Sequence, residues 1–342
     1  MFGITTSKNR DKIVDLSLGT LSVTSRNMGK YGPAKGLEPL RSLVLESYKA
    51  SFDDCGVLIT NGAIGGIDTI IRSEVSENDT ILIPEYCFPP YVNLLKKNNI
   101  KIITYRFRKK LGRGYALDMD YLQNLVDAHP VKLIVLNFPH NPTGAILTAD
   151  EAKRLAEIIK EKNIRFLSDE VYNVFDYTGL NKSISGFYQN GFVVSSLSKS
   201  HAAASIRIGW VVSSNILMKD IFFYHENSVG SVSLPSQRLA ARIFKRPTDV
   251  ALLQNCRDVA VNILDSFELD YIFPEAGFFV CIKSKDPQKT CERLLTVGIK
   301  VASGKDFGLS SYIRVSFASS LERVEESFKK IASQLSKEHN SL

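Results

Sequence analysis

The sequence predicts an α/β fold: a large domain with a mostly parallel mixed sheet flanked by helices, plus a smaller α+β domain. Three observations predict it. Short β-branched segments alternate with segments of helical period, which is typical of βαβ units and a parallel sheet. Two of the β-branched segments stand only about ten residues apart, too close for a parallel crossover, so the sheet is expected to be mixed. After residue 249 one long helix pattern precedes shorter strands and helices.

The segments expected to form the large sheet are short, apolar and bounded by turn residues. In chain order they are Val57–Thr60, Thr80–Ile83, Lys101–Tyr105, Leu133–Asn137, Ile164–Ser168 and Phe192–Ser196. The clearest helix covers about 148–162, because Thr148 and Glu151 form a capping box ahead of a one-sided apolar pattern. Arg207–Ser213 follows the sixth strand closely and is expected to run antiparallel to it.

The C-terminal part of the chain predicts the smaller domain. A helix pattern over 249–267 is followed by strands at Phe278–Ile282 and Tyr312–Phe317 and by helices at 287–297 and 320–336. We therefore expect a large domain over residues 32–248 and a small domain over residues 1–31 and 249–342, connected by the long helix. The 342 residues fit two domains at roughly 150 residues each.

Composition indicates an ordinary globular protein. Apolar residues make up 44% and charged residues 23% of the chain, so disorder and coiled coil are excluded as fold classes. No apolar run approaches the roughly 18 residues that span a bilayer, and the N-terminus lacks the apolar core of a signal peptide. We expect a cytoplasmic protein without a membrane partner.

Charge and cysteine patterns exclude two further classes. The net charge is +7, but the densest basic stretch, 106–113, contains glycine and is expected to form a solvated hairpin or loop rather than a nucleic-acid surface. The five cysteines are odd in number and form no CxxC pair. Buried reduced thiols are therefore expected, with neither a disulfide framework nor a metal site.

Polar residues follow three consecutive predicted strands, and they converge because the carboxyl ends of parallel strands lie at one edge of a sheet. They are Asn141; Asp169 and Tyr172; and Ser196, Ser198 and Lys199. Upstream, Gly62-Ala63-Ile64 joins a strand to an apolar helix, whose free N–H groups suit a phosphate. No GxGxxG or GxxxxGK[ST] motif is present, so a nicotinamide dinucleotide or a nucleoside triphosphate is not favoured.

Four sequence motifs, taken in chain order, resemble those of a known enzyme family. They are Phe138-Pro139-His140-Asn141-Pro142-Thr143-Gly144, Ser168-Asp169-Glu170-Val171-Tyr172, Ser196-Leu197-Ser198-Lys199-Ser200 with Arg207-Ile208-Gly209, and Arg314-Val315-Ser316-Phe317. Over nearly its whole length the chain resembles the class I/II aminotransferases, which are fold type I, aspartate aminotransferase-like enzymes dependent on pyridoxal 5′-phosphate. The resemblance implies transfer of an amino group from an L-amino acid to a 2-oxo acid by a ping-pong mechanism.

The resemblance also implies catalytic roles. Lys199 would bind the cofactor covalently and shuttle the α-proton of the substrate. Asp169 would pair with the pyridine nitrogen and keep it protonated, so that the ring withdraws electrons. Asn141 and Tyr172 would hydrogen-bond the ring oxygen.

Other residues would hold the phosphate, the ring face and the substrate. The residues expected to bind the cofactor phosphate are Gly62, Ala63, Ile64, Ser196, Ser198 and Arg207. Phe88 is expected to stack on the ring, with Tyr86 and Tyr91 as alternatives. Arg314 would bind the substrate α-carboxylate, with Asn141 and Gly19 close by. Tyr31 resembles the tyrosine that reaches the phosphate of a neighbouring subunit, which implies a homodimer with shared active sites.

The sequence departs from the family pattern in three places. The interval from Gly19 to Tyr31 is short, Leu21 stands where proline is usual, and Ser205-Ile206 precedes the arginine in place of glycine and an aromatic residue. Another outcome with the same cofactor therefore stays open: a lyase, a decarboxylase or an oxidative deaminase. A non-catalytic ligand sensor is disfavoured, because the resemblance begins near residue 14 and leaves no room for a DNA-binding domain.

The amino donor is not identified by the sequence. No second arginine can be assigned to a dicarboxylate side chain. Tyr86, Phe88, Tyr91 and Phe175 suggest an apolar or aromatic pocket, but packing in the core explains them equally well.

Overall fold

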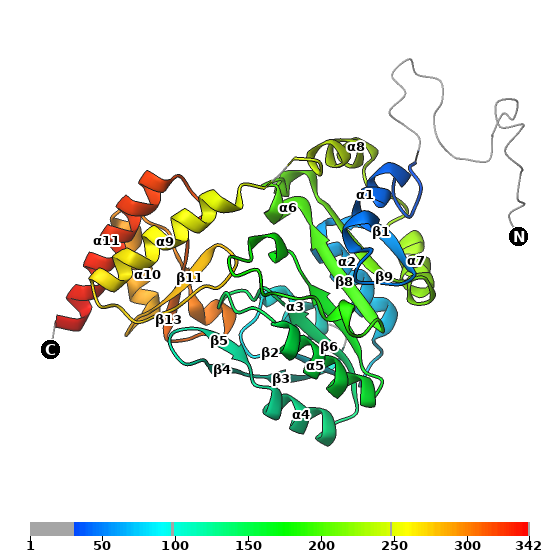
Figure 1. Cartoon of the computed structure of the whole chain (residues 1–342), viewed down its shortest axis with the longest axis horizontal. Coiled ribbons are helices and arrows are strands. Elements are labelled where there is room, and N and C mark those ends of the chain that lie inside the picture. Colours follow the sequence, from blue (N-terminus) through cyan, green and yellow to red (C-terminus); the bar gives the residue numbers. More distant parts are fainter. Residues whose placement is uncertain (1–30, 97–98, 247, 341–342) are drawn as a thin grey trace, which may run out of the picture.

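The computed structural model describes residues 31–96, 99–246 and 248–340. Its larger sheet has the strand order β1-β9-β8-β7-β6-β2-β3 (Figure 1). The bounds are Cys55–Asn61 (β1), Thr80–Pro84 (β2), Lys101–Tyr105 (β3), Val131–Asn137 (β6), Arg165–Asp169 (β7), Gly191–Ser196 (β8) and Ile208–Ser214 (β9). Only β9 runs antiparallel to its neighbours, β1 and β8, so the predicted mixed sheet is confirmed.

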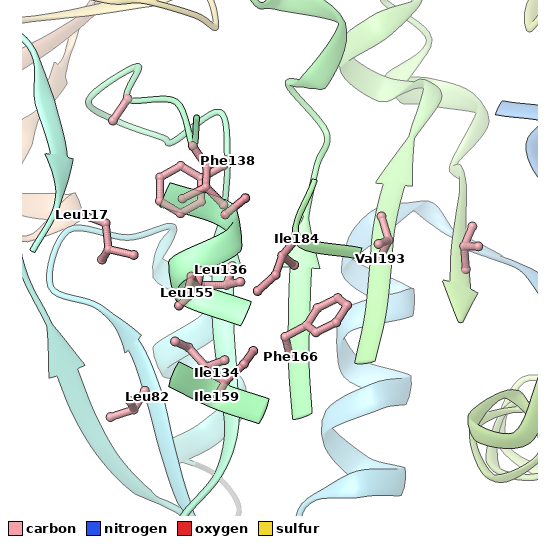
Figure 2. Packing of buried hydrophobic residues seen from close by; sticks show 14 of the residues in the cluster. Leu82, Leu117, Ile134, Leu136, Phe138, Leu155, Ile159, Phe166, Ile184 and Val193 are labelled. Atoms are coloured by element: carbon pink, nitrogen blue, oxygen red, sulfur yellow. The ribbon is translucent and has the colours of Figure 1, made fainter. Parts of the chain in front are cut away.

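Helices cover both faces of this sheet. They are α1 (Glu38–Tyr48), α2 (Gly62–Glu74), α3 (Pro89–Lys96), α4 (Met119–Ala128), α5 (Ala149–Glu161), α7 (Asn215–Ser228) and α8 (Leu234–Ile243). Successive residues of a strand point to opposite faces, so Ile134 and Leu136 of β6 pack under α5, as Figure 2 shows, whereas Leu133 and Val135 pack with α2, α3 and α7.

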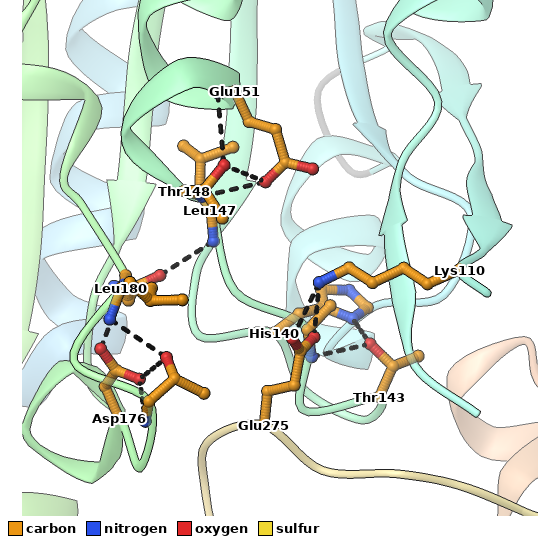
Figure 3. Close-up of polar contacts among 12 residues, drawn as sticks. Lys110, His140, Thr143, Leu147, Thr148, Glu151, Asp176, Leu180 and Glu275 are labelled. Carbon is orange, nitrogen blue, oxygen red and sulfur yellow. Dashed lines mark hydrogen bonds and ion pairs between the residues drawn. The ribbon is translucent and has the colours of Figure 1, made fainter. Parts of the chain in front are cut away.

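Helix α5 illustrates how the sequence sets an element. Thr148 precedes the helix, its backbone N–H donates to Glu151 Oε2 at 2.9 Å, and its own Oγ1 accepts from the Glu151 backbone N–H at 3.4 Å (Figure 3). The buried side chains all lie on one face of the helix. The predicted capping box and helix are therefore present.

A second, four-stranded sheet has the order β10-β11-β13-β12. Its strands are Tyr271–Ile272 (β10), Phe279–Lys283 (β11), Ala302–Ser303 (β12) and Tyr312–Ser316 (β13), and its helices are α9 (Val250–Ser266), α10 (Pro287–Thr296) and α11 (Leu321–Asn340). These elements share a separate hydrophobic core. The division at residues 31 and 248 stays a prediction, and the expected packing of the N-terminal thirty residues lies outside the described residues.

The basic stretch 106–113 belongs to a hairpin of β4 (Phe107–Lys109) and β5 (Tyr115–Leu117), as expected. The hairpin is not merely solvated. Lys110 Nζ contacts both carboxylate oxygens of Glu275, at 2.9 and 2.7 Å (Figure 3), and Arg113 pairs with Asp265. Since both acids lie in the C-terminal part of the chain, the hairpin links the two sheets.

Short helical turns complete the described structure: η2 (Asn173–Phe175), η3 (Ile184–Gly186), α6 (Leu197–Ser200), η4 (Ala204–Ile206) and η5 (Gly304–Phe307). The loop between β10 and β11 packs against the turn after β6, where the backbone N–H of Ala276 donates to Gly144 O at 3.1 Å. Gly144 has φ +71°, and a Cβ there would lie 2.8 Å from Pro274 Cα. This contact brings the smaller sheet over the carboxyl ends of the larger one. In the described ranges, no helix has the length and apolar character needed to cross a bilayer.

Candidate active site

A cavity of about 200 Å³ lies beyond the carboxyl ends of β6, β7 and β8, where an open parallel sheet binds ligands. Every residue predicted to be catalytic or to hold a cofactor lines it, apart from Gly62 and Tyr31. Its walls are Ala63, Ile64, Ile67, Phe88, Tyr91, Asn137, Asn141, Asp169, Val171, Tyr172, Ser196, Ser198, Lys199, Ala204 and Arg207. Of the three aromatic residues proposed for the ring face, Phe88 and Tyr91 reach the cavity.

Asp169 is the last residue of β7 and is only 4% exposed. The Tyr91 hydroxyl donates to its Oδ2 at 2.5 Å, and the backbone N–H of Val171 donates to its Oδ1 at 3.2 Å. Burial raises the pKa of Asp169 to about 6, although both hydrogen bonds and the charge of Lys199 act in the opposite direction. The carboxylate is thus fixed in place at the floor of the cavity.

The Asn141 turn is held by Asn137 at the end of β6. Asn137 Oδ1 accepts from the backbone N–H of Asn141 at 3.0 Å, and its Nδ2 donates to the backbone oxygen of Asp169 at 2.9 Å. Arg314 Nη1 donates to Asn141 Oδ1 at 2.8 Å. A guanidinium only donates, so this bond fixes the orientation of the Asn141 amide and leaves Nδ2 as a donor for the cavity.

The same turn is fastened through His140, which is 2% exposed. Its Nδ1 bonds Thr143 Oγ1 and its Nε2 bonds the backbone oxygen of Tyr86, both at 2.8 Å (Figure 3 shows the Thr143 contact). Burial lowers the pKa of His140 to about 3, so the ring is neutral and serves as a structural link. No role for His140 was predictable from the sequence pattern.

Lys199 follows β8 within α6, and its side chain is accessible from the cavity. Among the described residues, nothing forms a hydrogen bond or ion pair with its amine. Desolvation and the charges of Arg314 and Arg207 lower the pKa of Lys199, partly offset by Asp169. The site therefore holds an amine that is free to react and easier to deprotonate than an ordinary lysine.

The start of α2 and the start of β9 form a cradle suited to an anion. Gly62 has φ +69°, and a Cβ there would lie 2.5 Å from Arg207 Nη2. Arg207 itself has φ +54°, a conformation that non-glycine residues seldom adopt and that often marks a functional site. A Cβ on Gly209 would lie 2.6 Å from the Ala63 backbone nitrogen. The free N–H groups of the helix start thus lie beside a guanidinium.

A second acid, Glu170, lies beside Asp169 and is 3% exposed. Its Oε1 accepts from Ser168 Oγ at 2.9 Å and from Ser183 Oγ at 2.5 Å, whereas its Oε2 has no hydrogen-bond partner among the described residues. Burial, and secondarily the charge of Asp169, raises the pKa of Glu170 to about 7. No separate role for Glu170 was predictable from the sequence pattern.

Besides Gly62 and Tyr86, three described residues that the sequence proposed for the site do not line this cavity. Arg314 is half-buried at the edge of the site, against Asn141. Tyr31 is 77% exposed, and Phe175 is buried in the core. Gly19 lies outside the described residues. Within the described ranges, no cluster of three or more His, Cys, Asp or Glu side chains could hold a metal ion.

The comparisons with known proteins agree with this geometry. The family model for aminotransferase class I and II matches residues 10–331. A probable N-acetyl-LL-diaminopimelate aminotransferase from Bacillus subtilis is 27% identical over 326 residues, 89% of this chain and 81% of the relative. A probable aspartate/prephenate aminotransferase from Aquifex aeolicus is 28% identical over 331 residues, 90% of this chain and 83% of the relative. The crystal structure of an aromatic aminotransferase from Pyrococcus horikoshii has the same fold, with a TM-score of 0.82 and 22% identity over 92% of this chain and 89% of that one.

Proposed function

The chain belongs to the class I and II aminotransferases, and we propose that it moves the amino group of an L-amino acid to a 2-oxo acid by a ping-pong mechanism. It is a fold type I aminotransferase that depends on pyridoxal 5′-phosphate. One observation carries the proposal: the Lys199 amine, free of partners among the described residues, shares a cavity with the buried carboxylate of Asp169 and the guanidinium of Arg207.

The residues present fit pyridoxal 5′-phosphate. Asp169 is the buried anion that would face the ring nitrogen, and Lys199 is the amine that would link the cofactor to the protein. The free Nδ2 of Asn141 and the hydroxyl of Tyr172 would donate to, or share a proton with, the ring oxygen. The phosphate would lie in the cradle made by Gly62, Ala63, Ile64, Ser196, Ser198 and Arg207, and Phe88 would contact the ring face.

The protein's own residues divide the work of proton transfer. When bound, pyridoxal 5′-phosphate supplies a ring that delocalises the negative charge left on the substrate α-carbon. The Lys199 amine would accept the α-proton of the substrate and later donate it again, and its lowered pKa favours the role of proton acceptor. Asp169 would keep the ring nitrogen of the bound cofactor protonated, and the Tyr91 hydroxyl holds the Asp169 carboxylate in place by donating to its Oδ2.

Arg314 is the proposed site for the α-carboxylate. Among the described residues, no carboxylate lies within ion-pair distance of its guanidinium, so it is available for an anionic substrate. Asn141 accepts one of its N–H groups and thereby places the cation beside the cavity. A planar guanidinium binds a carboxylate through two parallel hydrogen bonds.

The assembly and location are also proposals. Tyr31 does not line the cavity of its own chain and is largely exposed, which supports its reaching the cofactor phosphate of a second copy in a homodimer. We place the large domain at residues 32–248 and the small domain at 1–31 and 249–342. Cys87, Cys256 and Cys281 are buried free thiols, which fits a cytoplasmic location.

A donor panel tests the proposal. The cofactor-loaded protein is mixed with single L-amino acids, including aspartate and the aromatic ones, in the absence of an oxo acid. We expect one donor class to convert the cofactor to its amino form and to release the matching 2-oxo acid in equal amount, as a ping-pong half-reaction requires. Release of carbon dioxide or of an alkene, or no reaction until an oxo acid is also present, would contradict it. The Lys199→Ala variant, supplied with the same amount of cofactor, is the control that measures any reaction between amino acid and cofactor that does not need the Lys199 amine.

A further inference from the structure

The guanidinium of Arg314 is enclosed by two phenyl rings. Its Cζ lies 4.3 Å from the ring centroid of Phe279 and 4.0 Å from that of Phe307. Both rings are only 8% exposed, so neighbouring side chains restrain them. Two aromatic rings therefore lie against the cation, and neither supplies a charged acceptor that would pair with its hydrogen-bond donors.

The two rings come from different elements of the smaller sheet. Arg314 on β13 lies directly opposite Cys281 on β11, and Phe279 stands two residues from Cys281. The pleat therefore puts Phe279 on the same face as Arg314, at the diagonal distance at which long side chains meet. Phe307 approaches from the end of η5, a segment that is not part of the β11–β13 pair.

The Phe307 segment is itself anchored to the larger sheet. The backbone N–H of Cys87 donates to Phe307 O at 3.0 Å. The next residue, Gly308, has φ +86°, and a Cβ there would lie 2.6 Å from Glu85 O. This close contact between two backbones fixes Phe307 beside the loop that carries Phe88 into the cavity.

Aromatic faces stabilise a cation without neutralising its donors. An ion pair with an acid would use the hydrogen-bond donors of the guanidinium, whereas an aromatic ring brings no acceptor oxygen that competes for them. Asn141 occupies one edge donor of Arg314, at 2.8 Å. The remaining donors can then bind a carboxylate in a partly buried place, where a charge-assisted pair is strong.

We propose that Phe279 and Phe307 are positioning residues that hold the edge of Arg314 toward the cavity and thereby set the affinity for the substrate carboxylate. The proposal rests on the proposed function, in which Arg314 binds that carboxylate. It predicts an effect on substrate binding and none on cofactor binding, because neither ring lines the cofactor cavity.

The test replaces each ring by leucine, which keeps apolar bulk but removes the π face. Phe307→Leu and Phe279→Leu are each expected to raise KM for the donor amino acid about two- to thirtyfold, the range that a desolvated cation–π contact supplies, with kcat within twofold of wild type. Propionate, a carboxylate without an amine, is expected to bind more weakly by the same factor, followed by the cofactor absorbance. Phe279→Tyr and Phe307→Tyr retain the ring and are expected to restore much of the affinity.

Phe278→Leu is the matched control. The ring centroid of Phe278 lies 5.4 Å from that of Tyr172 in an edge-on contact, as the centroid of Phe279 does at 5.6 Å, but the cation–π partners of Arg314 are Phe279 and Phe307. This variant is expected to keep the wild-type KM and propionate affinity. Cofactor affinity and thermal unfolding, measured for every variant, identify any loss of folding; should one leucine variant be unfolded, the other carries the same expectation.

The Arg314→Ala variant distinguishes the carboxylate-binding role of Arg314 from the positioning role of the two rings. If it abolishes propionate binding while both leucine variants behave as the Phe278→Leu control does, the rings have no positioning role and this inference is wrong, although Arg314 remains the carboxylate site. If Arg314→Ala leaves KM and propionate binding unchanged, the carboxylate site of the proposed function is wrong as well.

Discussion

Glu170 offers a measurable consequence of burial beside the cofactor site. Its folded-state pKa of about 7 lies above the ordinary glutamate value of 4.5, so between these two pH values the folded protein holds a proton that the unfolded chain releases. Stability contributed by this proton is complete below pH 4.5 and is lost as pH rises through about 7. The difference between the two pKa values of Glu170 corresponds to a decrease of about 3 kcal/mol at most in the free energy of unfolding, at 1.36 kcal/mol for each pKa unit.

Glu170→Gln removes the ionisation but keeps an acceptor for the hydroxyls of Ser168 and Ser183. We expect the variant to unfold with nearly the wild-type free energy at pH 5 and to be more stable than wild type by up to about 3 kcal/mol at pH 8.5. Urea unfolding at matched protein and cofactor concentrations, from pH 5 to pH 8.5, measures the difference. Glu170→Ala is the control: it loses both hydrogen bonds and is expected to be destabilised throughout this range.

The difference in stability between the glutamine variant and wild type reports the ionisation of Glu170, because all other groups titrate equally in both proteins. A glutamine variant whose stability falls in parallel with wild type from pH 5 to pH 8.5 would show that Glu170 is ionised throughout. The unpartnered Oε2 would then have to be solvated in the folded protein, and the reasoning from burial would be refuted.

Three further predictions concern the site. Asp169→Asn is expected to bind the cofactor, because the phosphate cradle is intact, but to slow α-proton removal by several orders of magnitude in single-turnover reactions; a rate within a few-fold of wild type would contradict the assigned role. Gly209→Ala places a Cβ against the Gly62 carbonyl carbon and is expected to weaken cofactor binding at least tenfold in equilibrium dialysis, since the cradle must open; an unchanged affinity would argue against the cradle. Tyr91→Phe removes a hydrogen bond to the Asp169 carboxylate and is expected to raise the pH at which the absorbance of the bound cofactor changes. Tyr105→Phe is the control: the Tyr105 hydroxyl donates to Val135 O instead, so this variant is expected to leave that pH unchanged.

Much of the fold could be predicted because its signals are local. The alternation of strand and helix patterns marked all seven strands of the large sheet, and the short interval before Arg207 predicted that β9 runs antiparallel. The capping box at Thr148 fixed the start of α5. Each of these signals depends on neighbours within a few residues, which a single sequence displays.

The sequence could predict which residues of the candidate site lie at the ends of strands, but not the contacts that support them. Asp169 ends a strand and Lys199 and Asn141 come shortly after strands, so the topology alone brings the three residues together. Their supporting contacts depend on how helices and loops pack over the sheet. Tyr91 reaches Asp169 across 78 positions of sequence, and Phe307 meets Arg314 from a separate turn, so no local pattern distinguishes either aromatic residue from ordinary core packing.

The pairing of β1 with β9 has a consequence for biosynthesis. These strands are neighbours in the sheet, yet Asn61 pairs with Ile208, so the cradle for the phosphate closes only after a long stretch of chain has been made. A nascent chain that ends before Ile208 already carries Lys199 and Asp169 but lacks the strand that completes the binding site. The cradle is therefore complete only in a chain that has been made through β9, and because a ligand stabilises only the state that binds it, cofactor binding favours chains whose sheet is complete.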